Sequence, residues 1–172
     1  MATTLTISNV QSLLSWSYET TQDWGNNTSQ AGSFNFQDTL ANGTAADQAD
    51  KIYIAQTTIA AGGTTNLDLA GSLTDVFGNV ITFARIKAIA FKLLTTTAAS
   101  SVSIGGGTNP FINWVGAGTD TVRVLNGGCF LLFTPTATAY AVTAGTGDVL
   151  KLVNNDGSNI ATYQIVLVGC TA

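Results

Sequence analysis

The run Tyr163-Gln-Ile-Val-Leu-Val168 near the end of the chain decides the fold. β-branched and aromatic residues favour strands, and a nearly continuous apolar run of this length indicates a strand that is covered on both faces. A second run of the same kind, Cys129-Phe-Leu-Leu-Phe133, follows a pair of glycines. Both runs therefore predict central strands of a β-protein.

Shorter segments around these runs alternate apolar and polar residues with period two, which predicts half-buried strands. Turn-forming pairs such as Asn42-Gly43 separate them, because Asn and Gly tolerate positive φ. The sequence therefore predicts an all-β fold, a β-sandwich or jelly roll-like single domain over residues 41–172. The alternating segments are Ser33–Gln37, Lys51–Ile54, Ser101–Ile104 and Thr121–Val124.

Three connecting segments carry more local predictions. The apolar residues before Leu94 fit both a helical and a strand face, and we expect a short helical turn at Thr82–Arg85 and then a strand over Ile86–Leu94. Leu73–Asn79 is expected to form a short helix or a turn that ends at Gly78. Asn155–Ser158 is expected to be the turn of a β-hairpin.

Residues 1–40 differ from the rest because large aromatic side chains are spaced along a polar segment. Trp16, Tyr18 and Trp24 lie among Ser, Thr, Gln and Asn residues, which do not form a core by themselves. Trp and Tyr are favoured interface anchors, so these three residues are candidate interface residues of an extended N-terminal arm. The alternative is an edge strand and loop of the same sandwich.

The surface predicted for this chain is polar but poorly charged. Hydrophobic residues make up 45% of the chain and charged residues 9%, against about a quarter charged residues in an ordinary soluble domain. Such a surface offers little resistance to association with copies of itself, so we expect much of it to be covered by other subunits. A monomer with a Thr-rich surface is the alternative.

Charge and hydropathy also limit the kinds of partner that the sequence predicts. The net charge is −4 and the six basic residues are scattered, so the cationic footprint of a nucleic-acid-binding protein is missing. No apolar run is long enough for a membrane span. The first residues lack the basic and apolar regions of a signal peptide, and we therefore expect synthesis and folding in a host cytoplasm.

The two cysteines, Cys129 and Cys170, both lie in apolar strand-like runs. Buried reduced thiols are the expected state of both residues, in keeping with a cytoplasmic protein. A disulfide between them stays open at this stage, because a sequence gives no distance between the two Cα atoms.

Residues that carry catalysis are scarce. The chain has no His, which excludes Ser–His and Cys–His catalytic pairs and every His-ligated metal site. Two carboxyl groups in a cleft are the minimum for glycoside hydrolysis, and the pairs Asp47 with Asp50 and Asp68 with Asp75 are candidates, although nothing further in the sequence singles them out. Asp side chains that bond the backbone of their own turn explain these residues as well. We expect a protein that is not an enzyme and has no cofactor.

Several segments have a familiar order. Residues 43–53 lead into 67–89, and they are followed by Asn126–Leu132, Tyr140–Leu152 and Ala161–Gly169. This order resembles small structural proteins encoded among the head genes of tailed bacteriophages, over roughly residues 40–170. The resemblance rests on a β-pattern and defines no functional residue, and residues 1–40 do not share in it.

The resemblance implies a virion component on the capsid surface, most simply a capsid cement or decoration protein. Its expected partners are the major capsid protein and copies of itself, and a closed ring on a local symmetry axis favours a trimer. One alternative is a component of the tail, neck, vertex or fibre base. A second alternative is a carbohydrate-binding sandwich, in which Trp24 or Trp114 stacks on a sugar.

Overall fold

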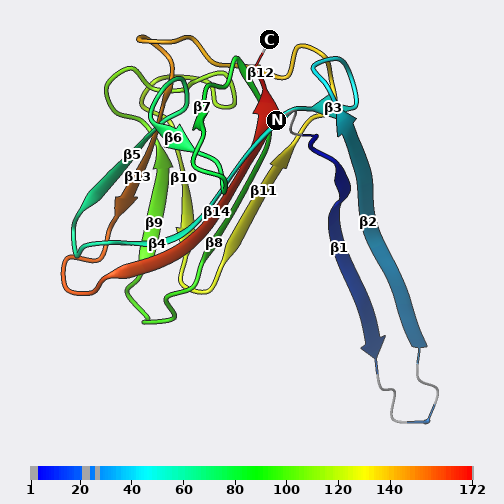
Figure 1. Cartoon of the computed structure of the whole chain (residues 1–172). Coiled ribbons are helices and arrows are strands. Elements are labelled where there is room, and N and C mark those ends of the chain that lie inside the picture. Colours follow the sequence, from blue (N-terminus) through cyan, green and yellow to red (C-terminus); the bar gives the residue numbers. More distant parts are fainter. Residues whose placement is uncertain (1–3, 21–23, 26–27, 172) are drawn as a thin grey trace.

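The structure is a computed structural model, which describes residues 4–20, 24–25 and 28–171 (Figure 1). Within these residues all regular structure is β-structure, which confirms the predicted all-β fold. The strands are β1 (Ile7–Thr20), β2 (Thr28–Asn42), β3 (Gln48–Ala49), β4 (Lys51–Ile59), β5 (Thr64–Asp68), β6 (Leu73–Thr74), β7 (Val80–Ile81), β8 (Arg85–Leu93), β9 (Ser101–Gly105), β10 (Thr121–Leu125), β11 (Cys129–Phe133), β12 (Tyr140–Ala141), β13 (Val149–Asn154) and β14 (Ala161–Cys170).

Two antiparallel sheets form the sandwich. One has the strand order β10-β9-β13-β5, and the other has the order β11-β8-β14-β4 with β12 beside β8 (Figure 1). The main core lies between them, and buried residues of both sheets contribute to it, among them Ile104 and Leu152 from the first and Ile89 and Leu167 from the second. We call these the inner sheet faces, and the opposite face of the second sheet the outer face.

β14 is central to its sheet, as predicted from the run that it contains. It pairs with β4 on one side and β8 on the other. Tyr163, Ile165 and Leu167 point inward and are fully buried. The Tyr163 ring stacks on the Phe91 ring with centroids 5.4 Å apart, which is a favourable aromatic geometry.

Cys129–Phe133 forms β11 with the predicted bounds, but its predicted central position is wrong. β11 pairs with β8 and ends the described sheet on that side. Phe130 and Leu132 pack against the core, whereas Cys129 and Leu131 are exposed on the outer face. A continuous apolar run shows that both faces of a strand are apolar, but it does not show that both are covered by the same chain.

Two local predictions have different outcomes. No helical turn forms at Thr82–Arg85, and instead the strand β8 begins at Arg85, one residue before its predicted start. Leu73–Asn79 adopts the turn rather than the helix of the two predicted alternatives, between β6 and β7. The Asp75 carboxylate accepts hydrogen bonds from Phe77 and Asn79 and so holds this turn closed.

The predicted hairpin at Asn155–Ser158 is wrong, because the strands on either side of it lie in different sheets. Two buried polar side chains turn the chain from one sheet to the other. Asn154 donates a hydrogen bond to the carbonyl of Asn159 at 2.8 Å. The Asp156 carboxylate accepts the backbone N–H groups of Ser158 and Asn159, and these bonds, with one from the Asn159 side chain, lower the pKa of Asp156.

Gly169 lies where the β14–β8 register shifts, and no larger residue fits there. A Cβ at this position meets the Arg85 carbonyl oxygen and lies 2.8 Å from the Phe83 ring. We expect Gly169→Ala to lower the free energy of unfolding by about 3 kcal/mol, because two paired strands must separate to admit the methyl group. In Gly157→Ala the methyl group meets nothing within 4 Å, and the change is expected to stay within about 0.5 kcal/mol. Urea denaturation of both variants checks this, and equal effects would contradict it.

Burial of Tyr163 makes stability depend on alkaline pH. Burial raises the pKa of Tyr163 from its ordinary value near 10 to about 12. The folded state therefore favours the neutral phenol over the phenolate. The contribution of the neutral Tyr163 side chain to the free energy of unfolding is complete below pH 10 and is lost as the pH rises towards 12. We expect wild type to lose more stability than Tyr163→Phe across this window. Denaturation midpoints at several pH values test it, and parallel pH profiles for the two proteins would contradict it.

Candidate interaction surface

A long two-stranded ribbon projects from the sandwich (Figure 1). It consists of β1 and β2, which pair antiparallel from Ile7 opposite Leu40 to Thr20 opposite Thr28. The 14 residues of β1 correspond to a length of about 46 Å. Neither strand pairs with the two sandwich sheets, and β2 continues into a short parallel pairing with β3. We call β1 and β2 together the arm.

One face of the arm is apolar and exposed. In an antiparallel pair, residues directly opposite each other point to the same side, so Leu14 and Phe34 share a face, and Trp16 and Tyr18 follow on it at two-residue steps. The Trp16 ring lies over Gly32, because a Cβ on Gly32 would be 2.5 Å from the indole. We call this surface the ribbon face, and its exposed fractions are 64% for Leu14, 46% for Trp16, 75% for Tyr18 and 61% for Phe34.

The opposite face of the arm is mostly polar. Over the described strands it presents the paired residues Ser15 and Ser33, then Ser17 and Glu19, whose side chains hydrogen-bond to each other. Leu13 is the large apolar exception on this side. The arm is therefore amphipathic, and its ribbon face is the side that a partner has reason to cover.

The structure brings two of the three predicted interface residues together. Trp16 and Tyr18 lie side by side on the ribbon face, and Trp24 is 95% exposed in the connection between β1 and β2. Leu14 and Phe34 were not among the predicted residues of this surface. Apolar side chains recur at two-residue spacing on both strands, and this pattern could have indicated a shared face. It assigns Leu14 and Phe34 to that face only once the two strands are known to pair.

The base of the arm is held by a buried lysine. The register between β14 and β8 places Val168 opposite Ala88 and Gly169 opposite Ile86, which leaves Lys87 as the extra residue of a β-bulge. Its ammonium group donates to three backbone carbonyls, those of Ala45 at 2.8 Å, Pro135 at 3.1 Å and Thr136 at 2.8 Å. Burial lowers the pKa of Lys87.

Apolar contacts complete the attachment of the arm to the outer sheet face. Leu40 on β2 and Ala49 on β3 are buried against Ala88 and Val168, and Ile7 joins them from β1. Further along the arm, the Phe36 ring lies 5.3 Å from the Phe133 ring. The arm therefore covers one end of the outer face and leaves the rest of that face uncovered.

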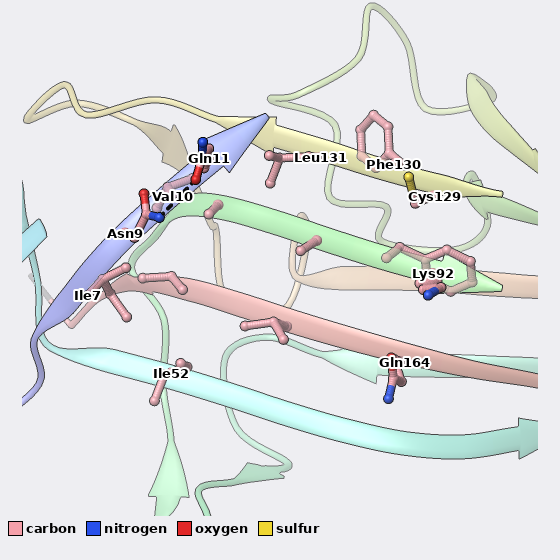
Figure 2. A pocket seen from close by; sticks show the side chains of 15 residues that line it. Ile7, Asn9, Val10, Gln11, Ile52, Lys92, Cys129, Phe130, Leu131 and Gln164 are labelled. Atoms are coloured by element: carbon pink, nitrogen blue, oxygen red, sulfur yellow. Dashed lines mark hydrogen bonds between the residues drawn. The ribbon is translucent and has the colours of Figure 1, made fainter. Parts of the chain in front are cut away.

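The uncovered part of the outer face is a shallow apolar groove of about 490 Å³ (Figure 2). Leu131, Ala90 and Val166 line it in a row, because the strand registers place Leu131 opposite Ala90 and Ala90 opposite Val166. Ile54 on β4 lies opposite Val166 and continues this row just beyond the residues that line the groove. Leu131 is 39% and Ile54 51% exposed. We call this surface the outer groove.

The two ends of the outer groove differ. The first residues of the arm, including Val10 and Gln11, border one end, and Lys92, Cys129 and Gln164 border the other (Figure 2). This second end is polar, and the Gln164 side chain donates a hydrogen bond to Gln56 at 2.8 Å. The groove is thus an apolar strip between the arm and a polar margin.

Both cysteines are free thiols, but the prediction that both are buried is wrong for Cys129. Cys129 is exposed at the polar end of the outer groove, because β11 is an edge strand. Cys170 is buried as predicted, with its sulfur 3.5 Å from the carbonyl oxygen of Gln48. The disulfide that the sequence left open is not present in this structure.

Three of the four acidic residues singled out from the sequence, Asp50, Asp68 and Asp75, accept backbone hydrogen bonds. Asp68 accepts the N–H of Ala70 at 2.9 Å, and Asp50 accepts the N–H of Thr171 at 2.9 Å. The hydrogen bond from the side chain of Asn79 is the main cause of the lowered pKa of Asp75. Among the described residues no three His, Cys, Asp or Glu side chains gather to hold a metal ion, and no described helix is long and apolar enough to cross a membrane.

Trp114 belongs to the core margin rather than to an open surface. Its ring lies 5.8 Å from the Phe130 ring, and its indole N–H donates to the carbonyl of Phe111 at 2.9 Å. The indole is therefore fixed on both its apolar and its polar side. Of the two Trp residues considered for sugar stacking, Trp24 is the one with an open ring.

Comparison of the chain with models of protein families, with curated proteins and with solved structures finds no match. The candidate surfaces are therefore described by their own geometry. They are the ribbon face of the arm, the exposed Trp24 beyond it, and the outer groove of the sandwich. All three are apolar or aromatic, and none gathers charge or nucleophiles.

Proposed function

We propose that this chain is a virion structural protein, a capsid cement or decoration protein that binds the major capsid protein and other copies of itself, with a trimer as the favoured ring. One observation carries the proposal. It is the long arm with a ribbon face that the chain itself leaves uncovered. The resemblance to proteins encoded among phage head genes suggests that the partner belongs to a capsid.

A ribbon of this kind needs a partner for physical reasons. An isolated two-stranded hairpin is at best marginally stable in water, and stable sheets require a third strand or a covering layer. Uncovered strand edges and a contiguous apolar face also promote association. The arm therefore has a stable place only when another surface covers it, and a particle made of many subunits provides such surfaces.

The sandwich has the rigidity that a capsid cement protein requires. Two sheets packed around a continuous core form a rigid block, because close-packed protein interiors have low compressibility. The low charge of the chain limits repulsion between neighbouring copies. A protein that bridges joints between capsid subunits under internal pressure uses rigidity and contact area, and it needs no reactive group.

The number of copies per particle tests the proposal. Quantitative mass spectrometry of purified particles is expected to find the chain at a fixed ratio to the major capsid protein, on the order of hundreds of copies, because a cement occupies every equivalent position of a symmetric shell. About twelve copies or fewer would overturn the cement assignment in favour of the tail, neck or vertex. Absence from purified particles would overturn the virion role altogether.

A further inference from the structure

We propose that the ribbon face of one copy lies in the outer groove of a neighbouring copy, so that the copies are joined by exchanged arms. The inference deepens the proposed function by naming the partner of the ribbon face as a second copy of this chain. Both surfaces are apolar, and each is left at least partly uncovered by its own chain.

The chain cannot fill its own groove in this conformation. The arm residues that border the groove end at Gln11, and the ribbon face begins beyond them at Leu14. From there the arm points away from the sandwich (Figure 1). Phe36, which contacts Phe133, marks the last aromatic contact of the described arm with its own body. The ribbon face is therefore presented to another molecule.

The same kind of contact already exists inside the chain. Ala88, Val168 and Ile52, which line the outer groove at its arm end, pack against Leu40 and Ile7 at the base of the arm. The groove row is the next row along the same strands. A second arm laid beside the first would thus continue an interface that the fold has already built, with the same classes of side chain on both sides.

The dimensions of the two surfaces agree. The groove row crosses four neighbouring strands, which corresponds to three interstrand spacings or about 14 Å. Leu14 and Tyr18 on the ribbon face are four strand residues apart, which is about 13 Å. A ribbon that spans the groove at this point leaves Trp24 beyond it, free to contact a further surface such as the major capsid protein.

Charge does not oppose the contact. The groove row and the ribbon face contain no charged side chain. Lys92 is the charged residue that borders the groove, at its polar end, and Glu19 on β1 lies on the opposite, polar face of the arm. An arm that enters a groove on the next copy is a heterologous contact, and it closes into a ring when the rotation permits.

The mass of the purified chain in solution provides the first test. Light scattering is expected to show a closed oligomer for wild type and a dissociation constant at least about a hundredfold higher for Ile54→Ser/Leu131→Ser, which truncates both ends of the groove row. Both side chains are already exposed, so the variant is expected to fold. Ile160→Ser, which changes a 58% exposed side chain in a loop, is the matched control and keeps the oligomer.

Cross-linking provides the second test, and it uses the native thiol of the groove. Gln30 is the cross-strand partner of Tyr18, so its side chain lies on the ribbon face. Ser29 is the cross-strand partner of Glu19, so its side chain lies on the polar face of the arm. A short bismaleimide is expected to join Gln30→Cys to Cys129 of another copy and give covalent dimers on a denaturing gel. The same reaction is expected to fail for Ser29→Cys and for Gln30→Cys in a Cys129→Ser background.

Each contrary result has a distinct meaning. A monomeric wild type, or a groove variant that keeps the full oligomer, overturns arm exchange. A cross-link that leaves the chain at monomer mass shows that the arm folds back on its own groove and overturns it as well. These tests use the chain without particles, so a high copy number on the capsid would still support the proposed function when arm exchange fails.

Discussion

Lys87→Met is expected to lower the free energy of unfolding by about 3–5 kcal/mol, a large part of the stability of an ordinary domain. Methionine keeps the apolar stem of lysine but removes the ammonium group that three backbone carbonyls share, those of Ala45, Pro135 and Thr136. The carbonyls of Ala45 and Thr136 then lose the donor that Lys87 supplied, whereas the Pro135 carbonyl keeps the backbone N–H of Asp47. Each part-buried carbonyl left without a donor costs about 1–3 kcal/mol.

The structural consequence extends beyond the sandwich. Ala45 lies in the loop between β2 and β3, so the ammonium group ties the base of the arm to the loop that follows β11. Without it, we expect the segment around Ala45 to lose protection from hydrogen exchange before the core strands do. Hydrogen exchange read by mass spectrometry measures this order directly.

Lys92→Met is the matched control for this prediction. Lys92 lies on the same strand, β8, but its side chain is exposed at the edge of the outer groove. Its replacement is expected to change stability by no more than about 0.5 kcal/mol. Equal losses for the two variants in urea denaturation would show that the three carbonyl contacts of Lys87 carry no special weight.

Leu14→Ser/Phe34→Ser is expected to detach the chain from particles, with a dissociation constant at least about a hundredfold higher than that of wild type. The two side chains face each other across the arm and are exposed by 64% and 61%. Burial of each by a partner contributes about 1.5–3 kcal/mol, and about 3 kcal/mol corresponds to a hundredfold change in affinity. Co-sedimentation of purified chain with particles that lack it measures the bound fraction.

The neighbouring pair on the other side of the same strands provides the control. Ser15 and Ser33 also lie opposite each other, one residue away from Leu14 and Phe34. Ser15→Ala/Ser33→Ala is expected to bind particles as wild type does. Circular dichroism is expected to show an intact fold for both double variants, because none of the four side chains belongs to the core. Undiminished binding of the Leu14/Phe34 variant would show that neither a capsid subunit nor a neighbouring copy holds the chain on the particle through the ribbon face.

Much of the architecture could be predicted from the sequence because strands carry a local signal. The period-two pattern identified segments that lie inside β2, β4, β9 and β10, and the run Tyr163–Val168 identified the centre of one sheet. These predictions depend on which side chains are apolar and on how neighbouring residues alternate. Both properties can be read from a few consecutive residues.

The errors arose where the answer depends on distant parts of the chain. Cys129–Phe133 is as apolar as Tyr163–Val168, yet one is an edge strand and the other is central, because pairing is decided by the rest of the sheet. Asn155–Ser158 has the composition of a hairpin turn, but the buried side chains of Asn154 and Asp156 direct the chain into the other sheet.

The candidate surface could be predicted only in part for the same reason. Trp16 and Tyr18 were identified from their chemistry alone, as aromatic residues in a polar segment. The outer groove was not predicted, since its row of Leu131, Ala90, Val166 and Ile54 comes from four separate strands. The bulge that turns Lys87 towards the base of the arm likewise depends on a register that no local pattern reveals.

Imaging of particles with and without the chain shows directly where on the particle the chain binds. We expect the difference density to lie on the outside of the head, at the joints between capsid subunits, and to repeat over the whole shell. We also expect rod-like connections between neighbouring copies at the position of the arm. Density confined to the tail, the neck or single vertices, or no difference at all, would contradict the account.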